Sequence, residues 1–273
     1  MKKVFIHLGL PKTGSSYLQY TFANNSIMYS QHGLIYKDFA NNFKDTIKNR
    51  LTNGNGGKIA NSLRTNFSLL NKSDNALKAK QDIKKKNLHI LDDFFSTLDN
   101  NENYNHLISS EAFSECTPDS LNYILNIINK NFKCVFVAFV RNPVDLIISL
   151  YNQRLKHERY TESFNVYYPS AILFVKKIFS LLIGLRQNII VFNYDVKKHN
   201  LINCFENLIF SKLISTEPKK IVNPSPNYHQ SEIIRLANNI GIPFRTVDAI
   251  NYIENNNKEG KKKKKIINFK INM

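Results

Sequence analysis

The segment Gly9–Gln19 reads GLPKTGSSYLQ. It contains Lys12 and Thr13 between its two glycines, and two further hydroxyl residues, Ser15 and Ser16, directly after the second glycine. Gly9 and Gly14 have the spacing of the nucleotide-hydrolysing phosphate loop, G-x-x-x-x-G-K-[ST]. In that loop the lysine follows the second glycine, whereas Lys12 lies before Gly14. Backbone N–H groups, hydroxyls and a cation stabilise negative charge on a bound group. The segment therefore predicts an anion-binding loop that does not suit ATP with magnesium.

Arg141 is a second basic residue in a chemically suggestive place, directly after the apolar run Cys134–Val140. Ser149 stands eight residues further along the chain, which is about two turns of the helix expected there. A guanidinium binds phosphate oxygens in bidentate geometry. An arginine at a strand end is by itself more often part of a surface ion pair. The phosphate-binding interpretation therefore depends on Arg141 and the glycine loop together.

Glu111 is the carboxylate best placed to act as a general base, because it follows the short predicted strand at 106–109. The alternative is a glutamate at a helix start that is stabilised by the helix dipole. His7 lies within the first predicted strand, where we expect a core histidine. Three further histidines are candidates for the base, without a distinguishing context: His106, His157 and His229.

The spacing of apolar residues predicts the elements that position these side chains. Val4–Leu8 predicts a buried parallel strand before the glycine loop, and a helix follows at about 15–24. Cys134–Val140 is apolar on both faces, as a central parallel strand requires. Asn142 and Pro143 predict the start of the next helix, as N-cap and first helical residue. The other predicted elements are helices at 118–130, 201–210 and 228–239 and a strand at 188–194.

Strands that alternate with helices predict a three-layer α/β sandwich with a mainly parallel central sheet. Ligands in such folds bind at the carboxyl ends of the strands. We expect a single domain over residues 1–250 with a helical insertion at about 37–105, interrupted by the glycine-rich segment 53–57. The lysine-rich end at 254–273 is expected to be disordered. Its run KEGKKKKK has two interpretations, a flexible basic arm or a frame-shifted terminus.

The net charge of +17 suits an anionic ligand. Three cysteines without ligand spacing argue against a disulfide framework and against a zinc site. The apolar run after Met1 is too short for an export signal. The later apolar stretch Ala171–Leu185 is broken by two lysines and falls short of the roughly 18 residues of a membrane span. We therefore expect a cytoplasmic protein without a transmembrane segment or a zinc site. The positive charge by itself would also suit a nucleic acid or a membrane surface, although we expect no nucleic-acid partner.

The glycine loop and the later segment FVRNPVDLIISLYNQ resemble the two cofactor motifs of sulfotransferases that use 3′-phosphoadenosine-5′-phosphosulfate (PAPS). The segments LISSEAF, IIVFNYD and NPSPNYHQSEIIRLAN are similar to weaker features of the bacterial, carbohydrate-type branch. The resemblance covers residues 1–30 and about 105–240. It implies the phosphate-loop nucleotide-hydrolase-like fold of that family.

The resemblance also implies roles for the site residues. Lys12 would stabilise charge on the leaving phosphate during an in-line displacement, and Glu111 would act as the base. Arg141 and Ser149 would bind the ribose 3′-phosphate, and the product would be adenosine 3′,5′-bisphosphate, with no metal required. The residues implied to bind the 5′-phosphosulfate are Lys12, Thr13, Gly14, Ser15 and Ser16. Asn223 and Ser225 either approach the cofactor or form a plain turn.

The leading hypothesis is a bacterial enzyme that moves a sulfuryl group from PAPS to a hydroxyl of a carbohydrate. The acceptor could be a lipid-linked or capsular sugar at the inner membrane. One alternative is a non-enzymatic binder of an acidic polymer, and another is a phosphate-loop nucleotide kinase, against which the missing G-K-[ST] argues. Four basic residues are either solvated surface charges, which is the commoner case, or a rim for an acidic glycan: Arg154, Lys156, Arg159 and Lys176. Tyr167 and Tyr168 are either a packed aromatic pair, again the commoner case, or a surface that stacks on a sugar ring.

Overall fold

The computed structural model describes two compact units. The first comprises Met1–Leu146 and Leu173–Val222, and the second Ile147–Ile172 and Asn223–Met273. Within them the described residues are 2–39, 41, 43–48, 54–69, 94–98, 103–129, 131–185, 188–214, 228–239 and 241. The predicted disordered end at 254–273 lies outside the described residues. The expected single domain over 1–250 stays a prediction.

The first unit is built on a five-stranded sheet of order β2-β3-β1-β4-β5, in which every pair of neighbours is parallel. Its strands are β1 (Lys3–Leu8), β2 (Leu34–Ile35), β3 (Asn105–Ser110), β4 (Lys133–Val140) and β5 (Ile189–Asn193). The four predicted strands are confirmed to within one residue at each end. The two-residue strand β2 was not predicted, since so short a strand has no readable alternation.

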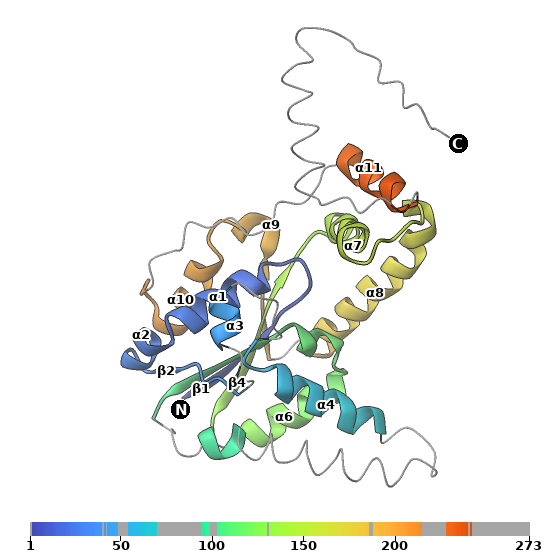
Figure 1. The fold of residues 1–273 in the computed structure, drawn as a ribbon. Coiled ribbons are helices and arrows are strands. Elements are labelled where there is room, and N and C mark those ends of the chain that lie inside the picture. The colour runs from blue at the N-terminus through green and yellow to red at the C-terminus, as the bar shows by residue number, and fades with distance from the viewer. Residues whose placement is uncertain are drawn as a thin grey trace, which may run out of the picture. The chain divides into compact units, whose positions relative to one another are not determined.

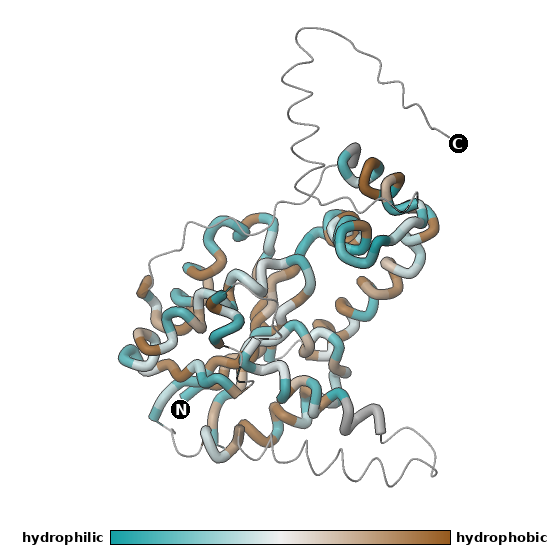
Figure 2. Tube along the Cα trace, viewed as in Figure 1, coloured by the Kyte–Doolittle hydropathy of each residue, from teal (hydrophilic) through white to brown (hydrophobic). Residues whose placement is uncertain are grey.

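Helices of the first unit cover both faces of this sheet (Figure 1). On one face lie α1 (Ser15–Asn24), α2 (Ser26–Gln31), α3 (Phe43–Ile47) and α10 (Leu201–Phe210). On the other lie α4 (Gly57–Leu69) and α6 (Pro118–Ile128), and α6 alternates hydrophobic and hydrophilic residues (Figure 2). The 3-10 helix η2 (Glu111–Glu115) follows β3, and α9 (Tyr194–Lys197) follows β5. The predicted three-layer α/β class is confirmed.

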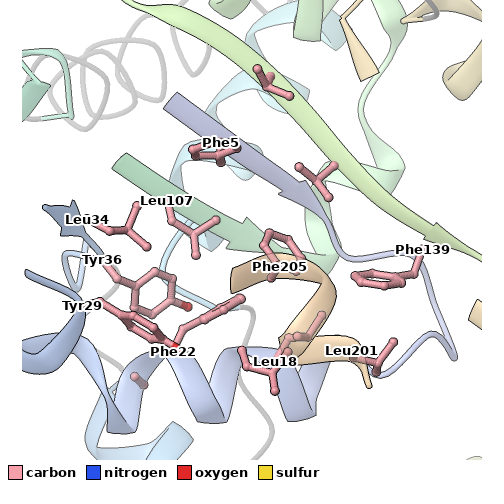
Figure 3. Packing of buried hydrophobic residues seen from close by; sticks show 14 residues of the cluster. Phe5, Leu18, Phe22, Tyr29, Leu34, Tyr36, Leu107, Phe139, Leu201 and Phe205 are labelled. Atoms are coloured by element: carbon pink, nitrogen blue, oxygen red, sulfur yellow. The ribbon is translucent and has the colours of Figure 1, made fainter. Parts of the chain in front are cut away.

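Aromatic and aliphatic side chains fill the space between the sheet, α1 and α10 (Figure 3). Phe22 of α1 meets Phe205 of α10 edge to face, with ring centroids 5.2 Å apart. Phe5 of β1 and Leu18 of α1 are almost fully buried in the same cluster. Burying a side chain of this size stabilises the fold by roughly 1.5–3 kcal/mol. The cluster therefore holds α1 rigidly against the strand that precedes the glycine loop.

His7 is a core residue of β1, as expected from its position in the sequence, and it is fully buried. Its Nδ1 lies 2.8 Å from Ser109 Oγ, and its ring meets Phe139 and Phe205 edge to face. Its Nε2 has no hydrogen-bond partner among the described residues. Burial lowers the pKa of His7 from 6.5 to about 3. The side chain is therefore neutral in the folded protein and does not suit general base catalysis at a ligand site.

We expect His7 to make the fold sensitive to acid. Below its unfolded pKa of 6.5 the unfolded chain binds a proton that the folded protein, with a pKa of about 3, does not bind. The contribution of His7 to the free energy of unfolding is therefore unaffected by pH above 6.5. Below pH 6.5 the free energy of unfolding falls by up to about 1.4 kcal/mol per pH unit because of this residue. The measurement is urea unfolding of wild type and His7→Leu at pH 7 and pH 5. The exposed His157→Ala variant serves as control, and an equal pH dependence in all three proteins would contradict the assignment.

The second unit contains most of α7 (Pro143–His157), the start of α8 (Phe164–Gly184) and α11 (Tyr228–Asn239). Asn142 begins α7 as predicted, because its Oδ1 accepts the N–H of Val144 at 2.9 Å. The apolar residues of this segment predict a buried side that comprises Val144, Ile147, Ile148, Tyr151 and Leu155. This prediction is wrong for Val144 and Ile148, which are 63% and 43% exposed. Ile147, Tyr151 and Leu155 are buried as expected. Val144 and Ile148 form one stripe along the helix, and Ile147, Tyr151 and Leu155 form another. Only the second stripe is buried by other side chains.

The helix α8 corrects the expectation that the stretch Ala171–Leu185 is too short to span a membrane. It begins at Phe164 and runs for 21 residues with a mean hydropathy of 1.5 over its most apolar window, so it meets the length and composition of a span. Only 33% of that window is buried within the structure. A core helix of a globular protein meets the same criterion, so this finding does not assign the chain to a membrane.

The predicted insertion at 37–105 is described only in part. Its described helices are α3, α4 and residues 94–98. One amphipathic helix is predicted here by the spacing of Ile83, Leu88, Leu91, Phe94, Phe95 and Leu98, and most of it lies outside the described residues. The glycine-rich segment, predicted as a break, leads directly into α4. Its N–H at Gly56 donates to the carbonyl of Ser109 in β3 at 3.1 Å. This end of the insertion is therefore attached to the sheet beside the predicted site.

Candidate active site

Four polar side chains of the first unit follow four adjacent strands at the carboxyl edge of the sheet. Glu111 follows β3, Lys12 follows β1, Arg141 follows β4 and Asp195 follows β5. In a parallel sheet these strand ends lie at one edge, where ligands of α/β proteins bind. The structure therefore brings together Lys12, Glu111 and Arg141, which are more than 125 residues apart at the extremes of the sequence.

The glycine loop presents the start of α1 without a cap. Gly14 is the N-cap residue in the left-handed conformation, with φ of 76°, and no side chain accepts a hydrogen bond there. A Cβ on Gly14 would lie 2.5 Å from Leu201 Cδ1, so the position requires glycine for space as well as for conformation. The first N–H groups of a helix have no partner within it and carry the positive end of the dipole. This end of α1 is thus suited to an anion.

The three hydroxyls of the loop occupy different environments. Thr13 is buried and its Oγ1 donates to the carbonyl of Leu10 at 2.7 Å, which holds the loop in shape. Ser15 is also buried and its hydroxyl donates to the carboxylate of Glu111. Ser16 is exposed. Of the three predicted ligand hydroxyls, only that of Ser16 faces solvent, whereas Thr13 and Ser15 bond to the protein itself.

Lys12 lies between a carboxylate and a guanidinium. Partial burial lowers the pKa of Lys12 below its ordinary value of 10.5, the charge of Glu111 raises it and the charge of Arg141 lowers it. Its backbone adopts a φ of 62°, in the left-handed region that side chains rarely occupy. The left-handed backbone is costly, and burial together with the neighbouring guanidinium disfavours the charged ammonium, which the Glu111 carboxylate offsets only in part. This arrangement is typical of a site that binds negative charge.

Arg141 is half-buried and only loosely paired. Its Nε lies 3.6 Å from Asp195 Oδ1, and this buried Nε has no hydrogen-bond partner among the described residues. Its guanidinium lies 5.6 Å from the ring centroid of Tyr194. The ion pair considered as the alternative for Arg141 therefore exists, with Asp195, but it leaves a buried donor unsatisfied. Such a donor is costly to leave unpaired, so the site is suited to an acceptor such as phosphate oxygen.

Glu111 is the first residue of η2, so both of its interpretations agree with its position. Its carboxylate accepts the hydroxyl of Ser15, and its charge acts on Lys12. Ser110 caps η2, since its Oγ accepts the N–H of Ala112 at 3.1 Å. The helix-start glutamate and the carboxylate beside the anion-binding loop are therefore the same residue, and one role does not exclude the other.

Ser149 belongs to the second unit, where it lies in α7 and is 6% exposed. Its predicted partnership with Arg141, a residue of the first unit, stays a prediction. Asn223 and Ser225 lie outside the described residues. Tyr167 is 6% exposed and contacts the guanidinium of Arg154, so it offers no free ring face to a sugar, whereas Tyr168 is 44% exposed. Arg154 is also paired with Glu158 at 3.1 Å.

Tyr194 and Asp195 were missed by sequence reasoning. Asp195 Oδ2 accepts the N–H of Asn142 at 2.7 Å, which ties the end of β5 to the start of α7. Burial raises the pKa of Tyr194. The charge of Arg141 lowers this pKa and the charge of Asp195 raises it, so that the pKa stays above its ordinary value of 10.0. The available signal was the segment IIVFNYD, in which Tyr194 and Asp195 directly follow a predicted strand. The rule that identified Arg141 at its strand end applies equally to them.

Within the described part of the chain, no group of three or more His, Cys, Asp or Glu residues could hold a metal ion. Cys116 and Cys134 are buried and free, and burial raises the pKa of each thiol. The polar groups gathered at the sheet edge are instead two cations, two carboxylates and hydroxyls.

No protein-family model matches the chain, and no curated protein matches it. Among solved structures it is similar to the sulfotransferase domain from the curacin biosynthetic pathway, at 17% identity and a TM-score of 0.45 over 80% of this chain and 76% of that one. It is also similar to the sulfotransferase domain of the Synechococcus PCC 7002 olefin synthase, at 15% identity and 0.43 over 76% and 71%. A sulfotransferase from Alicyclobacillus acidocaldarius gives 14% identity and 0.41 over 89% and 98%. These TM-scores lie below 0.5 and assign no function to this chain.

Proposed function

We propose that this protein is a PAPS-dependent sulfotransferase that transfers a sulfuryl group to a hydroxyl of an acceptor. The observation that carries the proposal is the pair of cations Lys12 and Arg141 at the ends of adjacent strands, beside the uncapped start of α1. One ligand with two separate anionic groups would satisfy both cations at once. PAPS has such groups, a 5′-phosphosulfate and a ribose 3′-phosphate.

The residues present fit this ligand. The start of α1, the exposed Ser16 and Lys12 would hold the 5′-phosphosulfate, since together they offer N–H donors, a hydroxyl and an ammonium. Arg141 would hold the 3′-phosphate through its unsatisfied Nε, with Ser149 as the second residue implied by the sequence resemblance. When bound, PAPS supplies the sulfuryl group and is converted to adenosine 3′,5′-bisphosphate.

Each charged residue then has a defined task in transfer. The Lys12 ammonium would neutralise charge that develops on the leaving phosphate, and such electrostatic stabilisation accounts for much of the rate enhancement of many enzymes. The Glu111 carboxylate accepts the proton of the attacking hydroxyl, and the hydroxyl of Ser15 orients it. Thr13 holds the loop that carries Lys12. No residue of the chain needs to form a covalent bond to the sulfuryl group.

A carbohydrate is the proposed acceptor, with a lipid-linked or capsular sugar in the bacterial cytoplasm, at the inner membrane, as the specific case. This part of the proposal is supported only by the sequence resemblance to the carbohydrate-type branch. A screen of purified sugars for incorporation of radiolabelled sulfate from PAPS tests it. Labelling of phenols or other small alcohols in place of sugars would overturn the acceptor class without changing the transfer reaction.

Calorimetric titration tests the proposed cofactor. We expect adenosine 3′,5′-bisphosphate to bind with a micromolar Kd, and adenosine 5′-monophosphate, which lacks the 3′-phosphate, to bind at least tenfold more weakly. ATP with magnesium is titrated in parallel, because tight magnesium-dependent binding would support the nucleotide kinase instead. The absence of adenosine 3′,5′-bisphosphate binding by the intact protein would overturn the proposal.

The lowered pKa of Lys12 predicts an alkaline limit to activity. Transfer needs the protonated ammonium, so kcat/KM for PAPS is expected to fall as pH rises through the Lys12 pKa, which lies below 10.5. In Lys12→Arg the limb is expected to disappear from the accessible range, because a guanidinium keeps its proton above pH 12. Burial moves the pKa of Tyr194 in the opposite direction, upward from its ordinary value. An unchanged limb in Lys12→Arg would assign it to another group.

A further inference from the structure

The strand that leads to Glu111 loses its neighbour before it ends. β3 runs from Asn105 to Ser110, but β2 pairs only with Asn105 and His106. From Leu107 onward, the edge of β3 that faces away from β1 has no strand beside it in the described sheet. Unpaired backbone groups at a buried strand end are costly. Some other part of the chain must therefore satisfy this edge.

The side chain of Asn55 takes the place of the missing strand. Its Nδ2 donates to the carbonyl of Leu107 at 3.1 Å, and its Oδ1 accepts the N–H of Ser109 at 2.8 Å. In a parallel ladder, one residue bonds the carbonyl and the N–H that flank its opposite residue in the same way. Asn55 is 0% exposed. Its amide thus acts as one peptide unit of an absent parallel strand.

Neighbouring glycines bring Asn55 close enough to make these bonds. Gly54 has a φ of 70°, and a Cβ at this position would clash with the carbonyl oxygen of Ser109. Gly56 donates its N–H to that same oxygen at 3.1 Å. A Cβ on Gly56 would also lie 2.6 Å from Ile108 and 2.8 Å from Phe113. The Gly54–Gly56 segment is therefore a clamp on the last residues of β3.

The same clamp continues into contacts with η2, which begins at Glu111. The helix α4 starts directly after the clamp, and its Ala60 carbonyl lies 3.6 Å from the thiol of Cys116. Arg64 of α4 forms an ion pair with Glu115 at the end of η2. Asn55 Nδ2 also donates to the carbonyl of Lys37 at 3.0 Å, which anchors the clamp to the chain beyond β2. The segment that carries Glu111 is thus held on both sides.

We propose that Asn55 is a positioning residue that fixes the end of β3 so that the carboxylate of Glu111 stays against Ser15 and Lys12. The inference rests on the proposed function, because that function makes Glu111 the general base. The effect of Asn55 on the position of Glu111 does not depend on the proposed function. The buried amide of Asn55 donates one hydrogen bond to Leu107 and accepts one from Ser109, and it thereby constrains both residues. Glu111 lies two residues after Ser109. Without the amide, the described bonds that hold this end of β3 are those to β1, to Gly9 and to the clamp backbone. We therefore expect the carboxylate of Glu111 to be held less firmly.

The first test measures the pKa of Lys12, because the charge of Glu111 raises it. Lysine side chains carrying carbon-13 methyl groups are titrated by NMR, and the Lys12 signal is assigned by its loss in Lys12→Arg. We expect Asn55→Ala to lower the Lys12 pKa, Glu111→Gln to lower it as well, and the double variant to lower it no further than Glu111→Gln alone. Equal lowering by Asn55→Ala in both backgrounds, or none in either, would overturn the inference.

Controls separate positioning from general destabilisation. Asn105→Ala is the matched control, since its Oδ1 accepts the N–H of Lys3 at 2.9 Å at the other end of the same strand. It is expected to lower the melting temperature but to leave the Lys12 pKa unchanged. Asn55→Ser keeps a hydroxyl that can bond to the backbone of β3. Its Lys12 pKa is measured alone and in the Glu111→Gln background in case Asn55→Ala does not fold. A Lys12 pKa change in Asn105→Ala equal to that in Asn55→Ala would make Asn55 merely structural.

Turnover gives the second readout. In an active wild type, Asn55→Ala is expected to lower kcat at least tenfold, to leave the Kd of adenosine 3′,5′-bisphosphate within twofold, and to have no effect in the Glu111→Gln background. If the wild-type protein does not bind adenosine 3′,5′-bisphosphate, the proposed function is wrong. The Lys12 titration still decides, in that case, whether Asn55 holds the carboxylate of Glu111 beside Lys12. A wild type that is active and an Asn55→Ala variant with full kcat would overturn the role of Asn55 alone.

Discussion

Lys12→Ala is expected to lower the rate of sulfuryl transfer from PAPS by about 10²–10³-fold, as the loss of one preorganised donor to a developing charge does in other enzymes. The ammonium lies near the charges of Glu111 and Arg141 at the sheet edge, and partial burial strengthens its electrostatic effect. The measurement is incorporation of radiolabelled sulfate from PAPS at saturating acceptor.

The fold is expected to survive this substitution. Lys12 lies in the loop between β1 and α1, and its aliphatic stem is not part of the apolar cluster that anchors α1. Its removal ends both the attraction to Glu111 and the repulsion with Arg141, and these two effects on stability oppose each other. The melting temperature checks this, and Lys177→Ala, which changes an exposed lysine of α8, is the matched control. Undiminished turnover in Lys12→Ala would remove this residue from the mechanism.

Arg141→Ala is expected to weaken binding of adenosine 3′,5′-bisphosphate by roughly 10–100-fold, since a hydrogen bond to a charged group contributes about 1.5–3 kcal/mol. Its buried Nε has no hydrogen-bond partner among the described residues, and its ion pair with Asp195 is long, at 3.6 Å, so a phosphate would have little to displace. The measurement is calorimetry of wild type and variant with adenosine 3′,5′-bisphosphate and with adenosine 5′-monophosphate.

The comparison of the two nucleotides identifies which phosphate Arg141 binds. Only the bisphosphate has the 3′-phosphate, so only its affinity is expected to fall. Arg154→Ala, whose guanidinium is paired with Glu158 in the second unit, is the control and is expected to bind both nucleotides as wild type does. An equal loss for both nucleotides in Arg141→Ala would place Arg141 at the 5′-phosphate or in the scaffold.

The local sequence determined most of the fold class and the gathering of Lys12, Glu111 and Arg141. Apolar runs such as Cys134–Val140 and the glycine spacing of the loop are read over a few residues, and their physical causes are equally local. Parallel strands align their carboxyl ends, so three residues that each follow a strand must lie at one edge. Their proximity therefore followed without knowledge of any single contact.

Only the tertiary structure decided which groups at that edge are engaged and by what. Asn55 bonds Leu107 and Ser109, 52 and 54 residues away, and the sequence marked its segment only as a break. Asp195 lies beside Arg141 because β5 happens to pair with β4. Thr13 and Ser15 face the protein and Ser16 faces solvent, although all three looked alike as loop hydroxyls. Such pairings depend on contacts between distant segments, which have no periodicity in the sequence and arise only when the chain has folded.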